Sequence, residues 1–273
     1  MADADIGGLD ELDDLEGFEL LPEPRRRDRI KSLAKKALPV PLWVRTSDLP
    51  KRAASALVML AVAGLGLSLG GIVWDAFIIL VALICFAELA RLVWRATRNP
   101  LGRVLGLLAG AGYIGVATAV LTGLGDFLLI LALGVTIFTD TGAYFSGRTI
   151  GGPKIAPRIS PSKTWAGLAG GMIASGAWVV GWVLAIDRGP AWLGPRFELG
   201  LNLNATNLLA CIALGAGLAI IAQMGDFFES WLKRRAHMKD SSNLIPGHGG
   251  VFDRVDGLLP VTIAIAGLGA ALV

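Results

Sequence analysis

The chain has 273 residues, of which 54% are hydrophobic and only 17% charged, and its mean hydropathy is +0.62. Soluble domains carry roughly 25% charged residues, so this composition indicates a membrane protein. The 36 glycines follow no three-residue period and lie mostly in apolar stretches, which excludes a collagen-like fibre. A net charge of only +3, with scattered basic residues, argues against nucleic acid as a partner. Two cysteines and two histidines are too few for a structural zinc cluster.

The N-terminal part of the chain divides into two segments of opposite charge. Residues 1–24 hold nine Asp or Glu and no Lys or Arg, which predicts an acidic disordered tail. Residues 25–52 are basic, with apolar residues at spacings of three and four that favour an amphipathic helix on an anionic membrane surface. A solvated basic linker is the alternative, because the apolar face is short. Residues 53–273 are then expected to form a single transmembrane domain.

Apolar runs of about 17 to 23 residues recur through the rest of the chain, and each is long enough to cross a hydrocarbon core of about 30 Å. They cover residues 53–71, 73–93, 104–123, 126–146, 165–186, 206–224 and 257–273. The sequence therefore predicts an all-α polytopic membrane protein with about seven transmembrane helices. A tight turn after Gly70 and Gly71 should make the first two spans a helical hairpin.

The basic residues predict the orientation of these spans. Of the 25 Lys and Arg, only Arg188 and Arg196 fall in loops on one side, and the others lie in the N-terminal segment or in loops on the opposite side. Because basic loops stay in the cytoplasm, we expect a cytoplasmic N-terminus and an external C-terminus. Two polar segments, 139–165 and 223–257, then share the cytoplasmic face.

The second polar segment combines carboxylates with a base and a hydroxyl. If the sixth span continues as a helix into the cytoplasm, Asp226, Ser230 and Lys233 share one face at i, i+4 and i+7. Asp253 and Asp256 also share a face at the start of the last span, where carboxylates are costly unless they hold a cation or pair with bases. Mg²⁺ is the natural candidate, since it takes oxygen ligands, few carboxylates and substrate phosphates. The alternative is a cytoplasmic loop whose charges pair with one another.

A glycine-rich stretch, 246–250, lies between these groups. Its backbone N–H groups could approach an anion closely, although a His-Gly-Gly loop is weak evidence on its own.

The first polar segment places an acid inside a span. Asp140 lies in the last turns of the fourth span, one turn before Tyr144, and an intramembrane acid is a functional-site hypothesis by default. Residues 160–164 (Ser-Pro-Ser-Lys-Thr) are expected to be a loop before a helix, where hydroxyls, free N–H groups and Lys163 could receive phosphates. Ordinary helix capping is the alternative for these hydroxyls.

Two further features have structural interpretations. Glu88 precedes Arg91 and Arg95 by three and seven residues, which favours a structural ion pair within the second span, with a catalytic site as the alternative. Trp178 and Trp182 are interpreted as packing or lipid-facing aromatic residues without a role in chemistry.

Taken together, these motifs resemble a known family, the phosphatidate cytidylyltransferases, or CDP-diacylglycerol synthases. Residues 230–256 fit the family signature Ser-x-Leu-Lys-Arg, four residues, Lys-Asp, then Pro-x-His-Gly-Gly-x-x-Asp-Arg-x-Asp. Residues 140–144 (Asp-Thr-Gly-Ala-Tyr) and 159–165 (Ile-Ser-Pro-Ser-Lys-Thr-Trp) resemble a second family region. The similarity runs from about Arg52 to the C-terminus.

The resemblance implies that CTP and phosphatidic acid are converted to CDP-diacylglycerol and pyrophosphate with magnesium as cofactor, in a bacterial-type inner membrane with the site facing the cytoplasm. It implies magnesium ligands at Asp226 and Asp253, with Asp256 as a further ligand or a neighbouring acceptor. These three residues, with Ser230 and Lys233, form the expected catalytic set. The expected substrate-binding set is Asp140, Tyr144, Ser160, Lys163, Thr164, Lys239, Asp240, His248, Gly249, Gly250 and Arg254. Membrane lipids are further expected partners, and a homodimer is left open.

Two other functional classes remain as alternatives. A secondary transporter of an anionic solute would also bury charges in a bundle, but it should show repeat symmetry and charges near the bilayer midplane. A non-enzymatic lipid-binding scaffold would need the basic residues but not the carboxylates among them.

Overall fold

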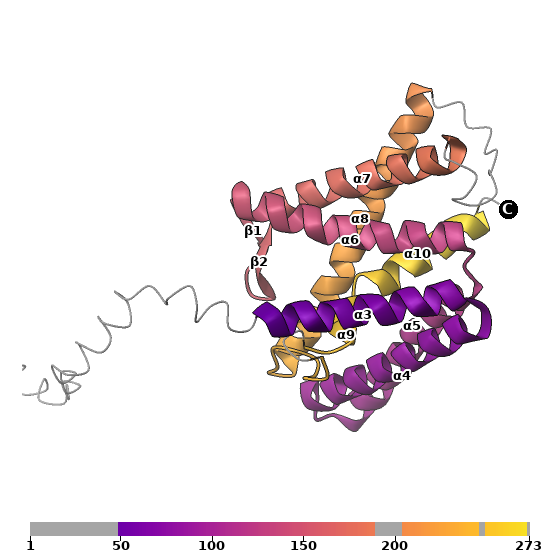
Figure 1. The fold of residues 1–273 in the computed structure, drawn as a ribbon. Helices are drawn as coiled ribbons and strands as arrows, with labels where there is room; N and C mark the ends of the chain where they lie inside the picture. Colours follow the sequence, from indigo (N-terminus) through magenta and orange to yellow (C-terminus); the bar gives the residue numbers. More distant parts are fainter. Residues whose placement is uncertain (1–48, 189–203, 246–248, 272–273) are drawn as a thin grey trace, which may run out of the picture. The chain divides into compact units, whose positions relative to one another are not determined.

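The computed structural model describes residues 49–188, 204–245 and 249–271. The predicted acidic tail, and all of the basic segment except residues 49–52, lie outside the described residues. The described elements run, in chain order, α3 (Leu49–Leu69), α4 (Gly71–Ala96), α5 (Pro100–Gly123), α6 (Asp126–Thr149), β1 (Lys154–Ala156), β2 (Ser160–Thr164), α7 (Trp165–Arg188), α8 (Ala205–Arg235), α9 (Phe252–Val255) and α10 (Leu258–Ala271) (Figure 1).

The all-helical membrane architecture predicted from the sequence is confirmed. Five helices, α4 to α8, are long and apolar enough to cross a membrane, and two shorter apolar stretches, Leu57–Leu69 and Leu258–Gly269, lie in α3 and α10. Each predicted span therefore coincides with one apolar helix. The protein is an integral membrane protein.

The turn between α3 and α4 is as tight as predicted. Gly70 and Gly71 have φ values of 59° and 50°, a left-handed conformation that glycine adopts without steric cost. Leu67 on α3 packs beside Trp74 and Phe77 on α4, so the two helices form a hairpin near this turn.

The largest buried cluster joins α6, α7, α8 and α10. Trp178 and Trp182 of α7 stack with ring centroids 5.7 Å apart, and their indole N–H groups donate to Leu131 O (3.2 Å) and Phe127 O (3.1 Å) of α6. Both tryptophans are therefore packing residues, which agrees with their interpretation from the sequence.

Helices α6 and α7 lie side by side in close contact (Figure 1). A Cβ atom on Gly170 of α7 would collide with the Ser146 hydroxyl and the Gly142 carbonyl of α6. Since backbones approach this closely only where side chains are small, these glycines fix the spacing of the two helices. The pair ends at the β hairpin, so the polar ends of α6 and α7 are held together.

Residues 160–164 are a strand, whereas the sequence predicted a loop. β2 pairs antiparallel with β1, with Lys154 opposite Thr164 and Ala156 opposite Ser160. The polar sequence carries little strand signal, and the backbone pairing with β1 stabilises the extended form. The Thr164 hydroxyl accepts a hydrogen bond from Gly167 N at 3.0 Å, so it caps the start of α7.

Candidate active site

A polar cavity of about 620 Å³ lies where the ends of α6 and α8 meet the hairpin and α9. Its lining brings both predicted polar segments together. It includes Asp140, Tyr144, Arg148, Lys163, Thr164, Gln223, Asp226, Glu229, Lys233, Asp240, Asp253, Arg254 and Asp256.

The polar face of α8 forms one wall of this cavity. Ser230 Oγ donates to Asp226 Oδ1 at 3.2 Å, and Lys163 from β2 forms an ion pair with Asp226 Oδ2. Arg234 Nε also donates to Ile159 O at 3.2 Å, which ties α8 to the β hairpin. The shared helix face predicted from the spacing is therefore present, and it faces a lysine from the other polar segment.

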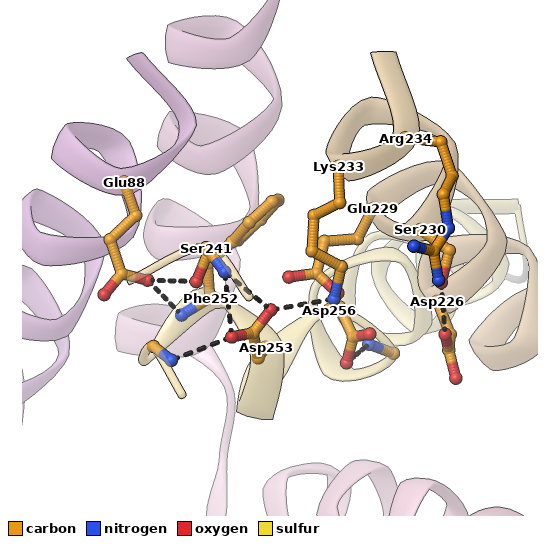
Figure 2. Close-up of polar contacts among 12 residues, drawn as sticks. Glu88, Asp226, Glu229, Ser230, Lys233, Arg234, Ser241, Phe252, Asp253 and Asp256 are labelled. Atoms are coloured by element: carbon orange, nitrogen blue, oxygen red, sulfur yellow. Dashed lines mark hydrogen bonds and ion pairs between the residues drawn. The ribbon is translucent and has the colours of Figure 1, made fainter. Parts of the chain in front are cut away.

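Lys233 is held between two carboxylates. Its Nζ lies 2.8 Å from Glu229 Oε2 and 2.8 Å from Asp253 Oδ1 (Figure 2). Glu229 is 1% exposed, and a carboxyl group so deeply buried is costly unless a partner such as the Lys233 ammonium group replaces its water. Glu229 lines the cavity and was missed by the sequence analysis, although its i, i+4 spacing to Lys233 was a signal.

Gln223 is a second cavity residue that the sequence analysis missed. It is 3% exposed, and its Nε2 has no hydrogen-bond partner among the described residues. Nothing in its apolar sequence context distinguishes it from a packing residue.

Asp253 is surrounded by donors from the 241–253 turn, defined as the described residues 241–245 and 249–253. Oδ2 accepts from Gly250 N at 2.8 Å and from Ser241 N at 3.1 Å, and Oδ1 accepts from Lys233. Burial alone would raise the pKa of this carboxyl group. Hydrogen bonds with Glu229, Lys233 and Gly250 outweigh burial and hold the pKa of Asp253 well below its usual range.

Asp256 behaves differently. Burial, followed by repulsion from Asp226, raises the pKa of its carboxyl group to about 7, and Asp140 acts in the same direction. Its Oδ1 accepts a hydrogen bond from Gly257 N at 2.9 Å. Three carboxylates therefore share one region, in which an added cation would relieve their mutual repulsion.

The contacts of Glu88 contradict the predicted ion pair with Arg91 and Arg95. Its buried carboxylate accepts from Ser241 Oγ (2.9 Å) and Phe252 N (2.8 Å), as Figure 2 shows. It also accepts from Ser242 Oγ (2.5 Å) and Val251 N (3.2 Å). These donors come from a turn more than 150 positions away, so local spacing could not identify them.

The remaining predicted residues are distributed around the site. Arg148 Nη1 donates to the Tyr144 hydroxyl at 3.0 Å on one wall. Ser160 is buried in the β hairpin, and Lys239 is exposed. Gly249 has a φ of 86°, and a Cβ there would collide with Asp253 Oδ2. His248 lies outside the described residues.

The three predicted magnesium ligands line one cavity but do not converge. Within the described ranges, no group of three His, Cys, Asp or Glu side chains is arranged to hold a metal ion. Asp226 and Asp253 are each neutralised by a lysine. Among the described residues, no lysine forms an ion pair with Asp256, which instead lies within repulsion range of Asp226.

Comparison with known proteins identifies the family. Residues 107–270 match the cytidylyltransferase family. A protein from Brucella suis named phosphatidate cytidylyltransferase is 39% identical over 165 residues, which cover 59% of this chain and 54% of that protein. Proteins of the same name from Haemophilus influenzae (40% identity, 49% of this chain and 42% of that protein) and Rickettsia bellii (36%, 53% and 60%) also match. The chain spans about half the length of these curated relatives. Because the family match extends over more than half of the chain, this protein belongs to the cytidylyltransferase family.

Proposed function

We propose that this protein is a phosphatidate cytidylyltransferase, which transfers the cytidylyl group of CTP to phosphatidic acid and releases pyrophosphate. The observation that carries the proposal is the polar cavity, in which Lys163 and Lys233 lie among carboxylates beside membrane-spanning helices. The names of the similar proteins support the same activity.

The reaction needs charge neutralisation more than covalent chemistry. A phosphate oxygen of the lipid attacks the α-phosphorus of CTP, and pyrophosphate leaves from the opposite side. Lys163 and Lys233 lie in the cavity as ammonium donors, and both are held by carboxylates before substrate arrives. Incoming phosphates would compete for these ammonium groups and lower the repulsion between the two anionic substrates.

Magnesium is the cofactor that the carboxylates suit best. Asp226 and Asp256 would hold the ion first, because Asp226 already raises the pKa of Asp256 by repulsion, and a dication would relieve it. Asp253 would join them when Lys233 turns to a substrate phosphate. The bound ion supplies charge neutralisation at the phosphates of CTP.

The other cavity residues receive supporting roles in this proposal. Arg254 would neutralise phosphate from α9, and Ser230 would hold Asp226 in place through its hydrogen bond. Asp140, Tyr144 and Asp240 would form walls around the substrates. Thr164 would act by starting α7 at the correct position after Lys163. We also propose that Lys239 and His248 contact substrate phosphates. Ser160 within the hairpin, and Gly249 and Gly250 in the turn around Asp253, are proposed to belong to the substrate-binding site as well.

We further propose that the site faces the cytoplasm of a bacterial-type inner membrane, with the N-terminus on the same side. The distribution of Lys and Arg supports this orientation. CTP, a cytoplasmic nucleotide, would then reach the cavity from water while phosphatidic acid stays in the bilayer.

The test is pyrophosphate release by the purified protein in nanodiscs that contain phosphatidic acid. Release should require CTP, phosphatidic acid and Mg²⁺ together, and a chelator should abolish it. Nanodiscs with phosphatidylcholine alone, and ATP in place of CTP, are the controls. A secondary transporter would give no pyrophosphate but would move an anionic solute into proteoliposomes, and that result would replace the proposal.

A further inference from the structure

We propose that Glu88 is a positioning residue of the proposed cytidylyltransferase site, because it holds the 241–253 turn in the conformation that presents Asp253 to Lys233. The proposal rests on the function proposed above. Glu88 does not line the cavity within the described residues, so it would act through other groups.

The carboxylate of Glu88 is matched to the turn on both of its oxygens. Oε2 accepts from the Ser241 hydroxyl at 2.9 Å and from Phe252 N at 2.8 Å. Oε1 accepts from the Ser242 hydroxyl at 2.5 Å and from Val251 N at 3.2 Å. Each oxygen therefore takes one hydroxyl and one backbone N–H, which is an arrangement that only a carboxylate satisfies fully.

The same turn supplies the donors of Asp253. Ser241 gives its hydroxyl to Glu88 and its backbone N–H to Asp253. Of three consecutive N–H groups, that of Gly250 donates to Asp253, and those of Val251 and Phe252 donate to Glu88. Figure 2 shows the Phe252 contact beside Asp253. Glu88 and Asp253 thus accept hydrogen bonds from neighbouring groups of one turn. If the turn moved away from Glu88, the groups that donate to Asp253 would move as well.

Burial makes this coupling strong. Glu88 is 6% exposed, and a charged group at such a position is costly unless hydrogen bonds replace its water. Gly250 leaves room for the contact, since a Cβ atom there would collide with both the Ser241 hydroxyl and the Glu88 carboxylate. The second glycine of the His-Gly-Gly motif is therefore explained by the approach of Glu88.

The connection from Glu88 to the cavity has three steps. Glu88 fixes Ser241 and Phe252. Ser241 N donates to the Asp253 carboxylate and Phe252 directly precedes Asp253, so both help to place this residue. Asp253 in turn holds Lys233 at 2.8 Å. Lys233 is the proposed phosphate-neutralising group. A misplacement of about 1 Å at such a group can lower turnover by up to about 100-fold.

Glu88→Gln is the decisive variant. The amide has the size of the carboxylate, so it creates no cavity, but it carries only one oxygen. In either rotamer its NH₂ group faces a donor, the N–H of Val251 or that of Phe252. Cys85→Ala is the matched control, because Cys85 is buried one turn earlier on α4 and packs in the same apolar cluster as Phe252 without a charge.

The full-length variants are compared in nanodiscs by hydrogen–deuterium exchange without ligand and by CTP-dependent pyrophosphate release. We expect Glu88→Gln to raise exchange in peptides covering residues 249–255 by about tenfold or more. The turnover of Glu88→Gln should fall by about tenfold or more, whereas Cys85→Ala should keep turnover within about threefold of wild type. The two variants should have similar melting temperatures. Wild-type exchange in Glu88→Gln, or turnover losses that follow the melting temperature equally in both variants, would overturn the proposal.

Ser242→Ala keeps the test decisive if Glu88→Gln does not accumulate. It removes one hydroxyl donor and leaves both backbone N–H contacts with Glu88. We expect exchange and turnover to change in the same directions by about two- to threefold, and wild-type values for both would refute the proposal. Since exchange needs no substrate, a wild-type protein without CTP turnover would refute the proposed function while the exchange result still decides the role of Glu88.

Discussion

Replacing Asp226 by Asn tests the assignment of metal and phosphate roles most directly. The substitution removes one negative charge without a change of size. At contact distances near 4 Å and an effective dielectric constant of about 20, one unit of charge contributes about 4 kcal/mol, which corresponds to roughly a thousandfold in binding or rate. We therefore expect turnover and magnesium affinity to fall by orders of magnitude.

The same variant should remain folded. The ion pair of Asp226 with Lys163 joins side chains that are 26% and 21% exposed, so its loss should cost about 1 kcal/mol or less. Loss of the Asp226 charge should also lower the pKa of Asp256 from about 7, because repulsion from Asp226 contributes to that value. Without magnesium, the melting temperature should stay close to that of wild type.

The assay compares magnesium-induced thermal stabilisation with CTP turnover in Asp226→Asn and in Lys163→Ala. Lys163→Ala frees the Asp226 carboxylate, so magnesium stabilisation should persist while the KM for CTP rises. Lys233→Ala is a less suitable contrast, since it would leave the buried Glu229 without its cation. Near-normal turnover in Asp226→Asn, together with lost magnesium stabilisation in Lys163→Ala, would refute this assignment of roles.

Three further predictions address pH, helix packing and topology. The pKa of Asp256 rises from 3.8 to about 7 on folding, so this group binds an extra proton in the folded protein between these values. Without magnesium, its contribution should make the free energy of unfolding fall as pH rises from about 4 to about 7, and Asp256→Asn should shift the slope of melting temperature against pH in the positive direction. Gly170→Ala should destabilise the protein by about 1–3 kcal/mol, because the added methyl group collides with Ser146. Gly181→Ala on the same helix has open space around it and should be neutral. Equal melting temperatures for the two variants would contradict the close packing of α6 and α7. A cysteine introduced at Ser162, after both native cysteines are replaced, should resist impermeant thiol reagents in intact cells, and external labelling would reverse the proposed orientation.

Hydropathy was sufficient to predict the helices. Each predicted span coincides with an apolar helix, because a bilayer imposes both the length and the composition of a helix that crosses it. The face of α8 that carries Asp226 and Ser230 was also predictable, since helix periodicity fixes it locally.

What the sequence could not predict were contacts between distant segments. Glu88 has arginines at helical spacing, yet its partners lie in a turn more than 150 positions later. Gln223 looks like a core residue until the cavity beside it is known. The hairpin strand at Ser160 exists because β1 pairs with it, and a polar pentapeptide contains no such information.

The length of α8 has a consequence for the membrane around the protein. Its 31 residues span about 46 Å at 1.5 Å per residue, which exceeds a hydrocarbon core of about 30 Å. The Asp226, Ser230 and Lys233 side chains therefore lie on the part of α8 that extends beyond the hydrocarbon core. Their position relative to the lipid headgroups depends on the tilt of this helix. A thicker or thinner bilayer would change the tilt and move all three groups together relative to the phosphate layer. The proposed cytidylyl transfer should consequently respond to acyl-chain length in the host bilayer, even when those lipids are not substrates.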